Sequence, residues 1–167
     1  TFVSSWIYRL SDSLLISSEG FRVRLRELGV ADNSIYYFPQ WVEDVMDTPD
    51  IHSTQKYREI EELLNVYSHL KKIVFTGNIG ECQDLPSVLK AIEILKHRND
   101  FVILIVGSGR EENHVRRLVS DNGLENHVKL LGRFPVEYMS SFYHFADALL
   151  LPLAKDPLFE ITVPGKT

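Results

Sequence analysis

The stretch 71–96 constrains the fold of this chain more than any other part of the sequence. It begins with the apolar run Ile-Val-Phe, which has the length and composition of a buried parallel strand. A turn containing Gly77 and Gly80 follows, and then a helix whose start is marked by Asp84 as a capping residue and by Pro86 in the first turn. This order directs backbone N–H groups and a helix N-terminus to one point, where an anion can bind. A tight turn for close helix–strand packing explains the two glycines equally well, because the GxxG spacing is short.

Composition narrows the class of protein. The chain has 167 residues, enough for one well-filled domain, with 44% hydrophobic and 25% charged residues, as in an ordinary globular protein. The net charge of −5 argues against a nucleic-acid partner, which selects for a basic face. The single cysteine, Cys82, leaves no internal disulfide or cysteine-based metal site. We find no signal peptide and no apolar run long enough to span a bilayer, so we expect a cytoplasmic protein. A first residue other than methionine and the ending PGKT suggest a piece of something longer.

The order of apolar runs predicts an α/β fold. Two short strands, 14–16 and 35–38, flank an amphipathic helix, and a proline-rich polar connector follows at about 41–56. After a helix at about 57–69, strands alternate with helices to the chain end, which predicts a Rossmann-like parallel sheet with flanking helices. The strands of this second part are predicted at 73–75, 101–106, 127–131 and 148–151. Right-handed crossovers bring the loops that follow these strands to one edge of the sheet, where ligands bind in open α/β sheets.

Motifs in these loops occur in a defined order. They are FTGNIGECQDLPSVLKAI (75–92), IVGSGREENHVRRL (105–118), NHVKLLGRFPVEYMSSFYHFADALLLPL (126–153) and DPLFEITVPGKT (156–167). Together they resemble the C-terminal domain of the retaining glycosyltransferases of family 4, which are two-domain enzymes of the GT-B type, in the variant seen in bacterial polysaccharide biosynthesis. Generic Rossmann packing does not explain LLGRFP followed by YHFADALLLP.

The resemblance also implies a domain organisation. Residues 1–45 correspond to the end of the N-terminal, acceptor-binding domain and the crossover, and 46–70 to a connector with a helix. Residues 71–167 correspond to a truncated C-terminal domain that binds the nucleotide sugar. We therefore expect a fragment of a GT-B fold that is inactive on its own.

The resemblance implies a diphosphate site on several loops. Its expected residues are Gly77, Asn78, Gly80, Gln83, Gly107 and Arg110. Many family members have arginine and lysine where this chain has Asn78 and Gln83. This loop is therefore expected to bind a diphosphate through uncharged hydrogen-bond donors. Lys166 is the best remaining cation and is expected to act in catalysis, with Arg110 behind it. An exposed lysine without a ligand is the alternative for Lys166.

The base and the donor sugar are expected near other loops. Backbone groups of Leu131, Arg133 and Phe134 would contact the base, although GRFP is alternatively a simple turn before a helix. Family members usually carry two glutamates eight residues apart. Glu160 matches the first, catalytic one near the donor sugar, to within about a residue, and the second would lie beyond Thr167.

The resemblance implies a nucleoside-diphosphate sugar as donor, most readily a UDP sugar, and no cofactor or divalent metal. The acceptor would be a glycan or a lipid-linked glycan bound by the N-terminal domain, and peripheral contact of the full-length protein with the inner face of the plasma membrane stays open. No spacing of the six histidines suits a metal site. Two alternatives remain: a nucleotide-sugar epimerase of the same fold, and a non-catalytic nucleotide-binding α/β module.

Overall fold

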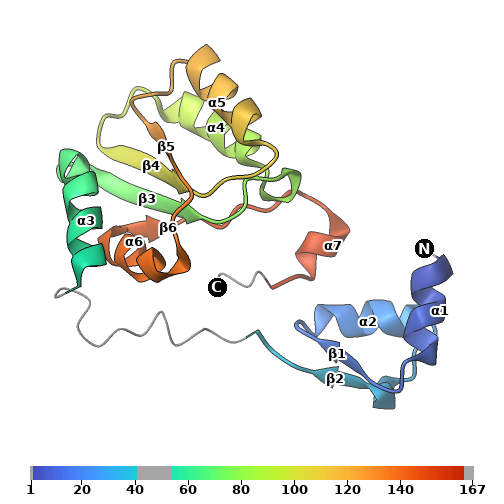
Figure 1. Cartoon of the computed structure of the whole chain (residues 1–167). Coiled ribbons are helices and arrows are strands. Elements are labelled where there is room, and N and C mark those ends of the chain that lie inside the picture. The colour runs from blue at the N-terminus through green and yellow to red at the C-terminus, as the bar shows by residue number, and fades with distance from the viewer. Residues whose placement is uncertain (1, 41–53, 164–167) are drawn as a thin grey trace. The chain divides into compact units, whose positions relative to one another are not determined.

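The computed structural model describes residues 2–40 and 54–163. Contacts between Cα atoms divide these residues into two compact units, one formed by 2–40 with 155–163 and the other by 54–154 (Figure 1). The expected connector at about 41–56 lies almost wholly outside the described residues. The segment 155–163, which the sequence placed in the C-terminal domain, groups with residues 2–40.

The first unit is a small α/β layer. Its elements in chain order are α1 (Phe2–Leu10), β1 (Leu14–Ile16), α2 (Gly20–Glu27), the 3-10 turn η1 (Asp32–Ser34), β2 (Ile35–Tyr37) and α7 (Pro157–Glu160). Strands β1 and β2 pair in parallel, and Ile16, Leu25 and Ile35 form the centre of a small core. The two strands and the helix between them, α2, agree with the sequence prediction.

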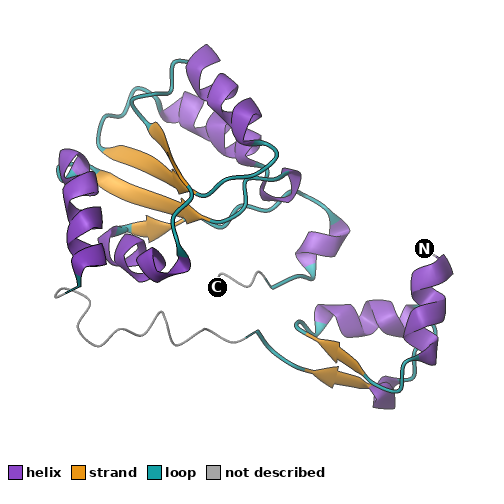
Figure 2. Cartoon of the chain, in the orientation of Figure 1, coloured by secondary structure: helices purple, strands orange, loops and turns teal. Residues whose placement is uncertain are grey.

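The second unit carries the main sheet. Its elements in chain order are α3 (Gln55–Leu64), η4 (Asn65–Tyr67), β3 (Lys71–Thr76), η5 (Glu81–Gln83), α4 (Leu85–Leu95), β4 (Phe101–Val106), α5 (Glu112–Asp121), β5 (Val128–Gly132), η6 (Val136–Tyr138), α6 (Met139–Phe145) and β6 (Ala148–Leu149). The four strands are parallel and lie in the order β5-β4-β3-β6. This confirms the predicted parallel sheet with flanking helices (Figure 2).

Successive side chains of the two central strands, β3 and β4, pack alternately into two hydrophobic cores on opposite faces of the sheet. Phe75, Ile103 and Ile105 pack under α4 and α5, whereas Val74 and Leu104 pack on the opposite face under α3 and α6. All six residues of β4 are buried, which explains why its sequence FVILIV is apolar throughout instead of alternating. The sheet is therefore a rigid central layer covered on both faces.

Three predicted details differ from the structure. Asp84 is the residue before α4, but its backbone is left-handed (φ 40°) and its side chain makes no capping hydrogen bond, because the chain enters α4 directly from the η5 turn instead of from an extended segment. The helix predicted at 57–69 ends as an α-helix at Leu64 and continues as a 3-10 turn. The strand predicted at 148–151 pairs with β3 through only two residues.

Asp147 fastens the start of β6 to the start of β3. Its Oδ2 accepts a hydrogen bond from Lys72 N (2.9 Å), its Oδ1 lies 2.9 Å from Lys71 Nζ, and its own N–H donates to Lys72 O (2.8 Å). The hydrogen bond from the Lys72 amide, followed by that from Lys71, lowers the pKa of Asp147 to about 2. These contacts give Asp147 a structural role at the start of β6.

This pKa predicts acid sensitivity. The unfolded chain has an ordinary aspartate pKa of about 3.9, so ionised Asp147 favours the folded state above that pH. As the pH falls from about 4 towards 2, the carboxylate is protonated and this contribution is lost. In urea denaturation at a series of pH values, Asp147→Asn should therefore flatten the loss of stability in this window. An acid limb as steep as that of the wild type would contradict the assignment.

Candidate functional site

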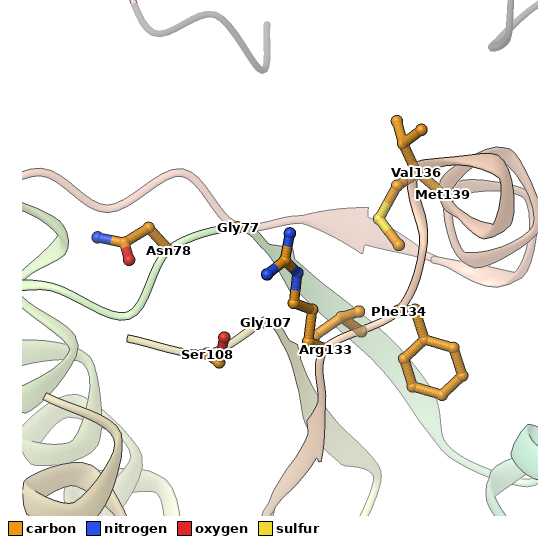
Figure 3. Close-up of a pocket in the computed structure, with 9 residues that line it drawn as sticks. Gly77, Asn78, Gly107, Ser108, Arg133, Phe134, Val136 and Met139 are labelled. Carbon is orange, nitrogen blue, oxygen red and sulfur yellow. The ribbon is translucent and has the colours of Figure 1, made fainter. Parts of the chain in front are cut away.

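A cavity of about 480 Å³ opens at the carboxyl ends of β3, β4 and β5 (Figure 3). Its lining comes from the loops that follow these three strands and from the start of the η6–α6 segment: Gly77, Asn78, Val106, Gly107, Ser108, Arg133, Phe134, Val136 and Met139. Five of the predicted site residues are among them, namely Gly77, Asn78, Gly107, Arg133 and Phe134. The topology thus gathers three of the predicted loops at one place.

The loops after β3 and β4 are joined by a ladder of backbone hydrogen bonds. Gly77 N donates to Val106 O (2.8 Å), Ile79 N to Ser108 O (2.9 Å) and Glu111 N to Ile79 O (3.0 Å). The loop after β5 joins them, because Gly107 N donates to Gly132 O (2.7 Å). These bonds extend the pairing of the sheet into the loops and hold the cavity floor in one conformation.

Glycine is required where the loops meet. The φ of Gly107 is +151°, and a β-carbon there would stand 1.8 Å from the carbonyl oxygen of Gly77. A β-carbon at Gly109 would stand 2.2 Å from Ile79 O. No real contact is that short, so both glycines of the GSGR motif serve close backbone packing between the two loops.

A bulge at the end of β5 directs Arg133 to the cavity. Ile105 pairs with Leu130 but Val106 pairs with Gly132, so Leu131 is an extra residue in the strand. Gly132 has φ +80°, and the chain turns there. Leu131, predicted to contact the base, does not line the cavity; it packs against the core under α3 and α6.

The remaining predicted loop residues close the turn between β3 and α4. The side-chain oxygen of Gln83 accepts a hydrogen bond from Gly80 N (3.2 Å), and a β-carbon at Gly80 would lie 2.7 Å from Asn78 Nδ2. Neither Gly80 nor Gln83 lines the cavity. The sequence placed both at the phosphates; in the structure they shape the loop that presents Asn78.

Charge in the cavity is concentrated on Arg133. Its guanidinium lies between the loops of Asn78 and Ser108 and the segment of Val136 and Met139 (Figure 3). It is the one cationic side chain in the lining among the described residues, since Arg110 is exposed outside it. Within 54–154, the backbone N–H groups of Asn78 and Ser108 donate no hydrogen bond. One cation and two free N–H donors suit an anion.

The opposite side of the cavity is apolar. Val136 and Met139 border it from η6 and α6, while the Phe134 ring is turned to the core and packs edge-to-face on Phe142, with ring centroids 5.0 Å apart (Figure 3). Val106, Ser108, Val136 and Met139 were not predicted as site residues. The GSGR motif contains Ser108 and could have identified it, but Val136 and Met139 have the sequence pattern of ordinary helix residues.

The structure does not test the two predicted catalytic residues. Lys166 lies outside the described residues. Glu160 is the last residue of α7, in the unit formed by 2–40 and 155–163, and it is exposed. Their catalytic roles stay predictions. Among the residues described, no three His, Cys, Asp or Glu side chains are grouped so that they could hold a metal ion. In the same residues, no helix has the length and apolar character to cross a membrane.

Comparison with known proteins decides the family. The profile of the family described as "Glycosyl transferases group 1" matches residues 56–158, which include the whole cavity. The chain belongs to this glycosyltransferase family. The match confirms the GT-B type of glycosyltransferase that the loop motifs predicted.

Three similar proteins show how much of a family member is present. WcaI of Escherichia coli K12, assigned as a colanic acid biosynthesis glycosyl transferase, is 28% identical over 120 residues, which are 69% of this chain and 28% of WcaI. WbjE of Pseudomonas aeruginosa, assigned as a glycosyltransferase, is 22% identical over 166 residues, 97% of this chain and 39% of WbjE. The crystal structure of Anabaena HepE with UDP and glucose superposes with a TM-score of 0.73 at 15% identity, covering 93% of this chain and 42% of HepE. The chain thus spans less than half of the length of each of these relatives.

The contact between loops predicts a large effect of Gly107→Ala. The β-carbon would collide with Gly77 O and the φ of +151° would be strained, so we expect a loss of about 3 kcal/mol or more in the free energy of unfolding. Gly123→Ala is the matched control, because Gly123 also has a positive φ (+63°) but open space around it, and should cost about 1–2 kcal/mol. Equal losses in urea denaturation would show that crowding between the loops is not what requires Gly107.

The two neutral positions of the first loop should respond differently to an added cation. Asn78 lines the cavity, so Asn78→Arg should raise the affinity for inorganic pyrophosphate by about fivefold. Gln83→Arg adds the same charge but removes the partner of Gly80 N outside the lining, and should give no gain. Isothermal titration calorimetry at low salt measures both. An equal gain in the two variants would mean that net charge alone, and not the cavity, attracts the anion.

Proposed function

We propose that the protein is a retaining glycosyltransferase whose cavity binds the diphosphate and base of a UDP sugar, and that it acts in assembly of a bacterial cell-surface polysaccharide. The observation that carries the proposal is the combination, at one sheet edge, of the Arg133 guanidinium, the free N–H groups of Asn78 and Ser108 and an apolar wall. The family membership supports transfer of a sugar. The UDP in the HepE complex and the colanic acid assignment of WcaI support the donor and the pathway class.

The chemistry of transfer explains why such a site is useful. As the glycosidic bond breaks, the departing nucleoside diphosphate gains negative charge. A fixed cation and fixed N–H dipoles directed at its oxygens then stabilise the transition state more than the bound substrate. Arg133 would supply the charge, and the N–H groups of Asn78 and Ser108 would supply dipoles that need no reorganisation. The first loop adds no charge of its own, because Asn78 and Gln83 are neutral.

The remaining parts of the reaction fall to other residues. Val136 and Met139 would offer an apolar surface for the base. In this proposal Lys166 is a second cation for the diphosphate and Glu160 approaches the donor sugar. The reaction needs no divalent metal and no cofactor. A glycan or lipid-linked acceptor would bind in the remainder of a longer protein. That protein would act in the cytoplasm, and it would contact the inner face of the plasma membrane if its acceptor is anchored in that membrane.

The alternatives make different demands on the cavity. An epimerase needs acid and base side chains around the sugar, and none of the described residues that line this cavity is His, Asp, Glu or Lys. A non-catalytic nucleotide-binding module would show no dependence of binding on the sugar.

Nucleotide titration tests the proposal. We expect the protein to bind UDP more tightly than UMP, and UDP more tightly than ADP, GDP or CDP. Arg133→Met should weaken UDP binding by about tenfold to a hundredfold, the range of a charge-assisted hydrogen bond, with little change in thermal stability because Arg133 is exposed. Arg117→Met removes the same charge from the exposed side of α5 and serves as the control. Equal, weak binding of all nucleotides, or an unaffected Arg133→Met, would refute the site.

A further inference from the structure

One wall of the cavity is built by a segment that no strand supports. Val136 and Met139 border the cavity from η6 and the first turn of α6, directly after Pro135. Val136 is itself 48% exposed, so its own packing does little to fix it. Something else must hold this segment at a constant distance from Arg133 and the loops after β3 and β4.

Tyr138 connects this segment to α3. Its hydroxyl donates a hydrogen bond of 2.6 Å to Glu59 Oε2, across 79 positions of sequence. Both oxygens of Glu59 are engaged, because Gln55 Nε2 donates to Oε1 at 2.8 Å. Lys56 Nζ lies 5.9 Å from the centroid of the Tyr138 ring, within the range of a cation–π contact. The first turns of α3 thus present two side chains that contact the phenol, Glu59 and Lys56, and a third, Gln55, that holds Glu59.

The ring of Tyr138 continues the connection to the cavity. It packs edge-to-face on Phe134, with centroids 5.8 Å apart, and Phe134 packs in the same manner on Phe142, which is fully buried. Phe134 follows Arg133 directly in the chain. A shift of Tyr138 would therefore displace its neighbours on both sides, namely Phe134 on one side and Val136 and Met139 on the other.

We propose that Tyr138 and Glu59 are positioning residues of the nucleotide site, which hold the wall formed by Val136 and Met139 in place through the Tyr138–Glu59 hydrogen bond. The proposal rests on the proposed function for its ligand. It gives α3 a role in binding, although no residue of α3 lines the cavity. Neither Tyr138 nor Glu59 lines the cavity.

The chemistry of the pair suits a permanent connection. The hydrogen bond to Glu59, with burial as a smaller cause, raises the pKa of Tyr138, so the phenol stays protonated and remains the donor at neutral pH. A bond of this kind to an ionised acceptor is shorter and stronger than one between neutral groups.

Substitutions that remove either partner of this hydrogen bond test the proposal. Tyr138→Phe keeps the ring on Phe134 but removes the hydroxyl, and Glu59→Ala removes the acceptor. We expect each to weaken UDP binding by about threefold to tenfold and to raise the KM for the donor more than it lowers kcat. The double variant should be no weaker than either single one, because both remove the same bond. Glu59→Gln keeps an acceptor oxygen and should restore most of the affinity. Tyr67→Phe removes a hydroxyl that donates and accepts no hydrogen bond within the described residues and should bind UDP as the wild type does.

A second measurement reports the wall itself without nucleotide. The chain has two methionines, Met46 and Met139, so the methyl carbon signal of Met139 in an NMR spectrum is assigned by Met46→Leu. Tyr138→Phe and Glu59→Ala should shift this signal alike, and Tyr67→Phe should not. If the variants lose stability while the Met139 signal and the UDP affinity stay unchanged, the pair only supports the fold and the inference is wrong. If the wild type binds no nucleotide, the proposed function fails, and the Met139 signal still decides whether the pair positions the wall.

Discussion

The account depends on the close approach of two backbones at the end of the sheet. The carbonyl oxygen of Gly77 occupies the space that a side chain at Gly107 would need, and this allows the loops after β3 and β4 to join by hydrogen bonds beyond the last paired residues of their strands. The loop after β5 is tied to the same point through Gly107 N and Gly132 O. Three loops that are separated in sequence therefore behave as one surface, and the cavity has a floor that does not need a ligand to form it.

The two helical layers that cover the sheet have different roles. The layer of α4 and α5 packs on Phe75, Ile103 and Ile105, and so fixes the strands. The layer of α3 and α6 packs on the other face and also contributes one wall of the site, because α6 begins at the cavity. A partly buried hydrogen bond between Thr76 Oγ1 and Tyr143 OH (2.9 Å) joins α6 to the end of β3. The contacts that pack α6 on the sheet thus also position one wall of the cavity. In the proposal above, Tyr138 adds a contact between this wall and α3.

Much of this could be predicted from the sequence, because the signals involved are local. Apolar runs such as 101–106 identify strands, and the alternation with helices identifies the edge at which Gly77, Gly107 and Arg133 meet. The sequence prediction was wrong where the backbone conformation of a single residue decides which way its side chain points. The bulge at Leu131 changes which residues face the cavity, and the left-handed backbone at Asp84 removes a side-chain cap that its residue type favours. Val136 and Met139 have ordinary helical spacing, so nothing in the sequence distinguishes wall residues from core residues.

The most direct test of the account is hydrogen–deuterium exchange of the protein with and without UDP. The free N–H groups of Asn78 and Ser108 should exchange rapidly in the absence of nucleotide and become protected in its presence, together with residues 133–139. Protection confined to other parts of the chain, with these segments unchanged, would show that the nucleotide binds elsewhere and would contradict the central claim.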